Sequence, residues 1–166
     1  ATVYRVFPGG KDTLVLATFA AEVAAYFDDL AAAVAATSSL EDALVVALSV
    51  SCRDIQGDPA LTYLVEHEPE AILPYVSFDG LDPLLDWARG FAVPHLARFL
   101  SAPDAEVVGE WMARLIISYA FEPDPGLAGD LADPAVARRF VRTYVLPGIE
   151  AEPDAPLAPA STTHPT

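Results

Sequence analysis

Cysteine is nearly absent from this chain of 166 residues, in which Cys52 is the single example. One cysteine excludes an intramolecular disulfide and fits a reducing compartment. Within a helical pattern, a lone cysteine is far more often a small buried apolar residue than a nucleophile. We therefore expect Cys52 to be buried, and we expect no enzyme, because no cysteine–histidine or acid–base arrangement is visible.

Long hydrophobic runs are also missing, although 53% of the residues are hydrophobic and the mean hydropathy is +0.34. A membrane span needs about 18 uninterrupted apolar residues, and Asp12, Glu22, Asp28 and Asp29 interrupt the longest candidate. A secretory signal pattern is absent as well. We expect a cytoplasmic protein without a membrane partner, whose excess apolar surface lines a ligand cavity, an oligomer interface or both.

Basic residues are scarce, with 9 Lys and Arg against 24 Asp and Glu and a net charge of −15. Phosphate contacts require Lys and Arg, so most of this chain is unsuited to nucleic acid. The first fourteen residues differ, because Arg5 and Lys11 outweigh Asp12 and leave +1, against −16 for the remainder. Any contact with a polyanion is therefore expected at the N-terminal edge.

Strand patterns are nearly absent, and the apolar residues recur at helical spacing. The length suits one core, so we expect a single all-α bundle. Ser38 or Ser39 is a candidate cap for a helix that ends at Gly57, with Glu41 or Asp42 completing a capping box. The expected helices are 11–36, the helix from Ser38 or Ser39 to Gly57, 82–100 with a kink at Pro94, 103–121 and 134–146, with short helices and turns over 58–80.

The last two helices are unusually apolar. The helix over 103–121 is apolar nearly all round, which predicts burial over most of its circumference. A small monomeric bundle would not bury both terminal helices so completely, whereas pairing with a second copy would. The basic residues Arg138, Arg139 and Arg142 are expected to pair across that dimer with acidic residues such as Glu106 or Glu110, or to lie solvated near a helix C-terminus.

The opening segment carries the most specific pattern. It reads Thr2-Val3-Tyr4-Arg5-Val6-Phe7-Pro8-Gly9-Gly10-Lys11-Asp12-Thr13-Leu14. This segment resembles the end of the DNA-binding region in the TetR family of transcriptional regulators, whose pattern is Thr-(Leu/Val)-Tyr-x-x-Phe-x-(Gly/Ser)-Lys-(Asp/Glu)-x-Leu. It departs from that pattern at Val6, which replaces a frequent His or Tyr, and at Gly9-Gly10, which lengthens the turn by one residue.

The resemblance implies roles for three residues of this segment. Thr2 and Tyr4 would lie on the recognition helix and donate hydroxyl hydrogens to DNA phosphates, and Lys11 would begin a long connector helix where its charge favours a phosphate. The chain starts at Ala1, apparently within a helix. We therefore expect it to be a fragment that lacks most of the helix–turn–helix and does not bind an operator by itself.

The family's layout implies three parts. These are a helix–turn–helix remnant over 1–10, a ligand-binding and dimerisation domain over 11–149, and a disordered tail over 150–166. The implied function is a repressor that binds operator DNA as a homodimer and is released by a small, mainly apolar effector, with no cofactor. The alternative is a helical-bundle ligand carrier or interaction protein with no DNA role.

The family's layout also suggests which residues line the effector pocket and the dimer interface, although core packing is the commoner role for such side chains. The candidate pocket residues are Tyr63, His67, Tyr75, Trp87, Phe91, His95 and Trp111. The candidate interface residues are Trp111, Leu115, Tyr119, Phe140 and Tyr144.

One short run invites a metal interpretation, namely Glu66-His67-Glu68 with Glu70. Adjacent helical residues point in different directions, and no second histidine lies at ligand spacing. We therefore expect no metal site.

Overall fold

The computed structural model describes residues 10–68, 70, 80–121, 126 and 128–150, and for residues 10–22, 64 and 150 it describes the backbone alone. Thr2, Tyr4, Tyr75 and the tail over 151–166 lie outside the described residues, as does the side chain of Lys11. The expected division into three parts therefore stays a prediction.

The described part of the chain is helical and contains no strand, which confirms the all-α class. Its elements are α2 (Gly10–Ala35), α3 (Leu40–Gly57), α4 (Pro59–His67), α6 (Asp82–Leu96), α7 (Ala102–Phe121), α8 (Pro134–Phe140), the π-helical turn η1 (Val141–Val145) and α9 (Leu146–Glu150). The last three are continuous, and we call them together the C-terminal helix. No helix in the described ranges is long and apolar enough to cross a bilayer.

Side-chain caps determine where several helices begin. The Ser39 hydroxyl accepts a hydrogen bond from the Asp42 backbone N–H over 3.1 Å and begins α3, as the capping box predicts. Asp133 accepts from the Ala135 N–H over 2.7 Å at the start of α8, and Pro134 occupies the first turn. The helix expected over 82–100 is shorter than predicted: α6 ends at Leu96, and Pro94 lies in its last turn.

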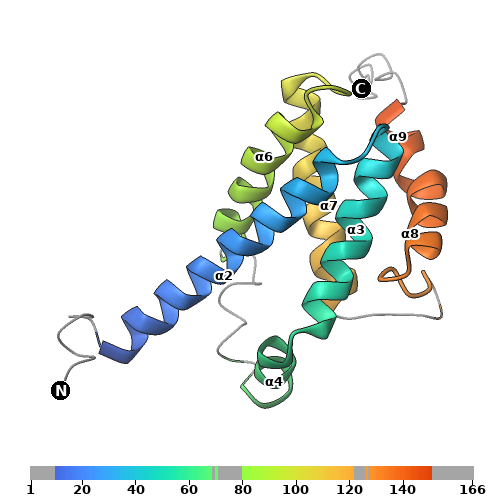
Figure 1. The fold of residues 1–166 in the computed structure, drawn as a ribbon. Helices are drawn as coiled ribbons and strands as arrows, with labels where there is room; N and C mark the ends of the chain where they lie inside the picture. Colours follow the sequence, from blue (N-terminus) through green and yellow to red (C-terminus); the bar gives the residue numbers. More distant parts are fainter. Residues whose placement is uncertain (1–9, 69, 71–79, 122–125, 127, 151–166) are drawn as a thin grey trace, which may run out of the picture.

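The helix α3 is the centre of the fold. It packs against α2 and α7 on one side and against α8 and η1 on the other, while α6 packs against both α7 and α2 (Figure 1). The residues of α3 include several that are almost fully buried, among them Leu44, Leu48 and Cys52, which confirms the expected burial of Cys52. The C-terminal helix contributes Val141 and Val145, both fully buried, to the same core.

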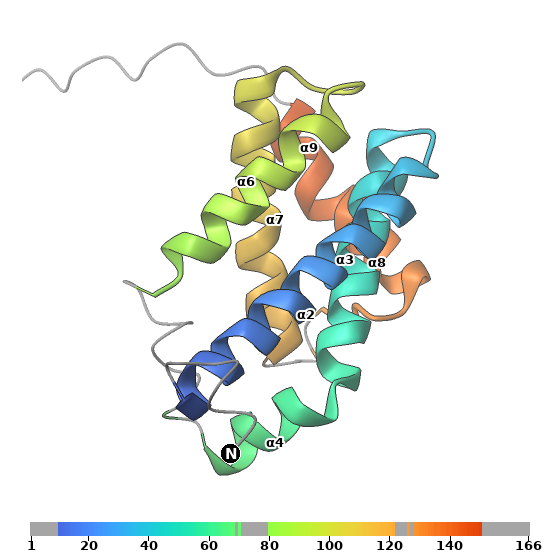
Figure 2. The ribbon, with the colours of Figure 1, turned by 60° about the vertical axis from the view of Figure 1, so that its left-hand side comes forward.

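The helix α2 has two unlike halves. Its C-terminal half lies against α3 and α6, where Leu30 and Val34 are buried in the core. Its N-terminal half extends beyond the other helices on the left of Figure 1, and in Figure 2, where that side is turned forward, it lies in front of the lower part of α7. Because α2 has 26 residues, it is about 39 Å long.

Candidate functional site: an apolar cavity

A cavity of about 120 Å³ lies among α2, α3, α6 and α7 and is partly open to solvent. Its walls carry no charged side chain. The lining residues are Tyr26, Phe27, Leu30, Val34, Ala43, Leu44, Ala47, Ile55, Leu84, Ala88, Phe91, Ala92, Leu96, Gly109, Met112, Ala113, Ile116 and Ile117.

Small residues on three helices leave this space unfilled. They are Ala43 and Ala47 on α3, Ala88 and Ala92 on α6, and Gly109 and Ala113 on α7. At Gly109 the helices α6 and α7 are in close contact, since a Cβ atom there would lie 2.4 Å from the Ala92 Cβ and 2.9 Å from the Ala88 carbonyl oxygen. The cavity is therefore bordered by a tight helix crossing that only glycine permits.

Aromatic rings form the wall between α2 and α6. The rings of Phe27 and Phe91 have centroids 5.3 Å apart, and Tyr26 meets Phe27 edge-on at 5.2 Å. On the far side of Phe91, the His95 imidazole stacks at 4.5 Å. Such ring contacts favour flat apolar or aromatic ligands over bulky aliphatic ones.

Tyr26 contributes the one side-chain hydroxyl among the lining residues. That hydroxyl is hydrogen-bonded to the Ser51 hydroxyl, and the Ser51 Oγ is also 2.5 Å from the Ala47 carbonyl oxygen of the preceding turn. Burial raises the pKa of the Tyr26 phenol above its usual value, so this group stays protonated and neutral.

Of the described candidate pocket residues, Phe91 lines this cavity, whereas Tyr63, His67, Trp87, His95 and Trp111 do not. Tyr63 and His67 lie one turn apart on α4, where their rings stack on each other at 4.6 Å and face solvent. Trp87 is 47% exposed and meets only the outer side of the aromatic wall, at Phe27. His95 is a step removed from the cavity, behind Phe91.

Trp111 also lies away from the cavity, because it faces the C-terminal helix rather than α6. A Cβ atom on Gly148 would lie 3.2 Å from the Trp111 indole. The lining residues of α2, namely Tyr26, Phe27, Leu30 and Val34, were not among the candidate pocket residues. Neither periodicity nor composition reveals which side of an apolar stripe adjoins unfilled space.

The candidate interface residues share one seam, where α7 meets the C-terminal helix. Tyr119 meets Phe140 edge-on at 5.4 Å, and Tyr144 lies 5.2 Å from Phe140. Phe140 is buried in the core of its own chain, while Tyr144 is 65% exposed. Among the large apolar side chains described, Val107 on α7 is the most exposed, at 68%.

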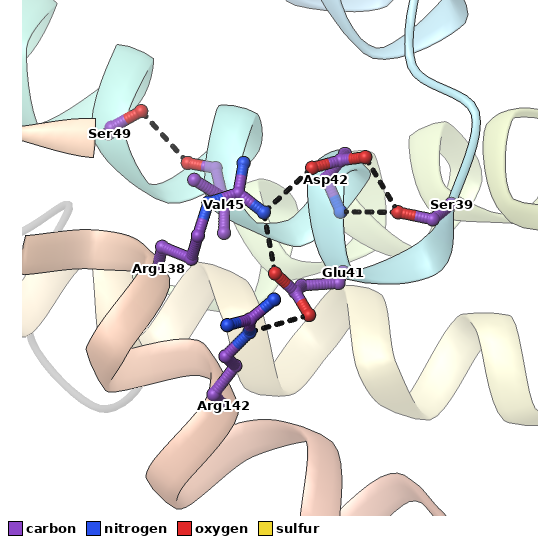
Figure 3. A network of polar contacts seen from close by, with 7 residues as sticks. All are labelled: Ser39, Glu41, Asp42, Val45, Ser49, Arg138 and Arg142. Atoms are coloured by element: carbon purple, nitrogen blue, oxygen red, sulfur yellow. Dashed lines mark hydrogen bonds and ion pairs between the residues drawn. The ribbon is translucent and has the colours of Figure 1, made fainter. Parts of the chain in front are cut away.

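The arginines of the C-terminal helix correct another expectation, since two of them pair within the chain (Figure 3). Arg138 lies 2.5 Å from Glu41 and 2.8 Å from Asp42, and Arg142 lies 2.8 Å from Glu41. The cause is the packing of this helix on the first turn of α3, where both carboxylates lie. Glu110 instead pairs with Arg89 and Arg114. Arg139 is exposed.

Hydrogen bonds from these arginines lower the pKa of Glu41 below its usual value, with Arg142 contributing most. The Ser39 hydroxyl and then Arg138 lower the pKa of Asp42 in the same way. Both carboxylates therefore stay ionised under mildly acidic conditions.

Arg98 joins α6 to the end of α2. Just beyond α6, its guanidinium donates to the Val34 carbonyl oxygen over 2.8 Å, to the Ala35 carbonyl oxygen over 3.3 Å and to the Thr37 hydroxyl over 2.9 Å. The last turn of α2 has no basic residue of its own. The Val34 carbonyl also accepts from the Thr37 N–H and hydroxyl. Arg98 therefore adds a further donor at the last carbonyls of α2 and places positive charge at its negative end.

No group of His, Cys, Asp and Glu side chains suited to hold a metal ion occurs in the part of the chain that is described. Comparisons with known proteins add no assignment: the chain has no significant match to a protein-family model, to a curated protein or to a solved structure.

Proposed function

We propose that this chain is the regulatory core of a TetR-like, ligand-responsive transcriptional regulator. The observation that carries the proposal is the double role of α2. Its C-terminal half forms one wall of the cavity, and its N-terminal half extends away from the bundle toward the opening segment with the helix–turn–helix pattern. One helix thus links a place where a ligand can bind to a place where DNA can be contacted.

In this proposal the cavity holds a small, mainly apolar effector, and occupancy changes the position of α2 relative to α3 and α6. A ligand shifts such an equilibrium only by its difference in affinity for the two states. Coupling energies of about 1–3 kcal/mol are typical, which correspond to changes of about 5- to 150-fold in DNA affinity. The opposite sign, activation by ligand, would use the same geometry, but release of a repressor is the sign that the resemblance implies.

The intact regulator acts as a cytoplasmic homodimer on operator DNA, with Thr2, Tyr4 and Lys11 contacting phosphates. Support for pairing comes from exposed apolar side chains on α7 and on the C-terminal helix, above all Val107 and Tyr144. Two heads held at a fixed spacing would match two half-sites about one helical turn of DNA apart.

The test begins with the coding sequence upstream of Ala1. The proposal expects a basic stretch of about 40–50 residues with a helix–turn–helix pattern. The full gene product is then used to select DNA from a random pool, and its binding to the selected duplex is measured by fluorescence anisotropy. Lys11→Ala should weaken binding to all duplexes and reduce the salt dependence. Arg53→Ala, which removes a positive charge from α3, is the matched control.

Two outcomes would contradict the proposal. An upstream region without a helix–turn–helix pattern would remove the DNA-binding role. A full gene product that enriches no duplex, while still binding small apolar molecules, would favour the alternative of a helical ligand carrier.

A further inference from the structure

The volume of the cavity matches a ligand of about one ring. Its volume is about 120 Å³, whereas sites for drug-sized molecules span about 300–1,000 Å³. An apolar protein cavity of about 150 Å³ is known to take up benzene. The rings of Phe27 and Phe91 on one wall, tilted by 47° to each other, can contact an aromatic ring through their faces and edges.

The lining also disfavours a charged ligand. None of its side chains is ionisable near neutral pH, because the Tyr26 phenol has a raised pKa. A charged ligand would lose its hydration without gaining a counter-ion, at a cost of several kcal/mol. The ligand is therefore neutral.

The direction of one hydrogen bond determines which kind of polar group a ligand can present to the Tyr26 hydroxyl. A carbonyl oxygen cannot donate, so the contact of 2.5 Å between Ser51 Oγ and the Ala47 carbonyl commits the serine hydrogen to that carbonyl. Ser51 can then only accept from Tyr26, and Tyr26 must be the donor in their contact. The Tyr26 oxygen keeps a free lone pair but has no hydrogen left to offer.

We infer that the cavity selects a neutral, single-ring molecule that carries a hydrogen-bond donor, such as a phenol, because its one hydroxyl is a committed donor and a free acceptor. This inference rests on the proposed function only in taking the cavity as the ligand site. Tyr26 is the specificity-determining residue, and Ser51 is the positioning residue that orients its hydrogen.

The test measures binding of phenol and of toluene, which replaces the hydroxyl by a methyl group, to the purified chain by calorimetric titration. Tyr26→Phe should weaken phenol about 3- to 10-fold, the equivalent of one neutral hydrogen bond, and leave toluene unchanged. Tyr144→Phe removes the same hydroxyl from an exposed site outside the cavity and should change neither affinity.

A second variant tests the direction of the bond without removing the tyrosine. Ser51→Ala frees the Tyr26 hydrogen, so pyridine, which only accepts, should bind more tightly than it does to the wild type. The position of the site is checked with Ala47→Leu, which narrows the cavity and should weaken phenol and toluene alike. Circular dichroism confirms that each variant is folded.

The outcomes separate the inference from the proposed function. Phenol and toluene binding that Ala47→Leu weakens but Tyr26→Phe leaves unchanged would overturn the donor preference and keep the cavity as a ligand site. Absence of binding by any probe would overturn the inference together with the effector half of the proposed function. The DNA-binding half depends on the separate duplex selection.

Discussion

The two sides of α3 differ in how completely the neighbouring helices fill the space against it. Toward α2, α6 and α7, small side chains such as Ala47 and Gly109 leave a cavity with an apolar lining. Toward the C-terminal helix, Val141 and Val145 are fully buried, and Arg138 and Arg142 close the edge with ion pairs to the first turn of α3. One side of the helix can accept a molecule, and the other is filled and held in place.

This difference suggests that one side of the core contributes stability while the other side retains a cavity. Protein interiors are packed nearly as densely as crystals, so unfilled space forfeits contacts and costs stability. A bundle can retain such space when the rest of its core is well filled. The C-terminal side thus supplies stability that the cavity side lacks, and the following experiments test that contrast from the largest expected effect to the smallest.

The largest effect should come from two leucines of α3 that are almost fully buried, of which Leu44 lines the cavity and Leu48 does not. Either leucine to alanine should lower the free energy of unfolding by about 2–5 kcal/mol, measured by urea denaturation. Toluene should restore part of the loss in Leu44→Ala, where the new space joins a cavity that a ligand can reach. Equal rescue of Leu48→Ala would contradict the contrast between the two sides.

Two glycines offer a matched pair for the close crossing of α6 and α7. Gly109→Ala forces a methyl group against Ala92 and should cost about 1–3 kcal/mol. Gly90→Ala, in the middle of α6 with nothing within 4 Å of the added methyl group, should stabilise the protein by up to about 1 kcal/mol. Thermal unfolding of both variants measures the difference, and a neutral Gly109→Ala would mean that the crossing is not tight.

These substitutions also show what the sequence can and cannot predict. Helix starts follow from local chemistry, and Ser39 and Asp133 are recognisable as caps because their partners lie two or three residues away. The pairing of Arg138 with Glu41 spans 97 residues, and nothing local to either residue identifies the other. The cavity is likewise assembled from four helices, and of the described candidate pocket residues Phe91 is the one that lines it.

Most of the aromatic residues that were predicted to line a pocket do not line that cavity. Tyr63 and Trp87 looked suited to a pocket but remain at the surface, since their helices turn other faces inward. The cavity exists because alanine and glycine from different helices meet, and such meetings depend on how the helices cross. Apolar periodicity identifies a buried face without showing whether the opposing face fills it.

A smaller effect is expected from Arg98, which holds α2 on the cavity side. Arg98→Ala removes the guanidinium donors and the positive charge from the last carbonyls of α2 and should cost about 1 kcal/mol. Hydrogen exchange should quicken in the last turns of α2 and stay unchanged in the middle of α3. Arg53→Ala is the control, because Arg53 pairs with its neighbour Asp54 and contacts no carbonyl of α2 among the described residues. Uniform quickening in both helices would mean that Arg98 acts on the whole fold.

The smallest effect should appear on the other side, at the ion pairs of Glu41. Since its pKa is lowered in the folded state, the stabilisation is complete above the ordinary carboxyl pKa of about 4 and is lost as the pH falls through the lowered value. Glu41→Gln should therefore lower the melting temperature slightly near neutral pH and match the wild type in acid. Glu106→Gln, an exposed change of equal charge, should show no such convergence.

The hydrogen bonds from Arg98 to the end of α2 also determine how far the other end of this helix moves when the helix rotates. With that end held, the 26-residue helix acts as a lever arm of about 39 Å, and a rotation of only about 5° at the capped end would carry Gly10 through about 3.4 Å. That displacement is about the rise of one base pair along a duplex, given about 34–36 Å for each helical turn of 10–10.5 base pairs. A small rotation of α2 at its Arg98 end would thus be enough to shift the DNA-binding head of the proposed regulator by about one base pair.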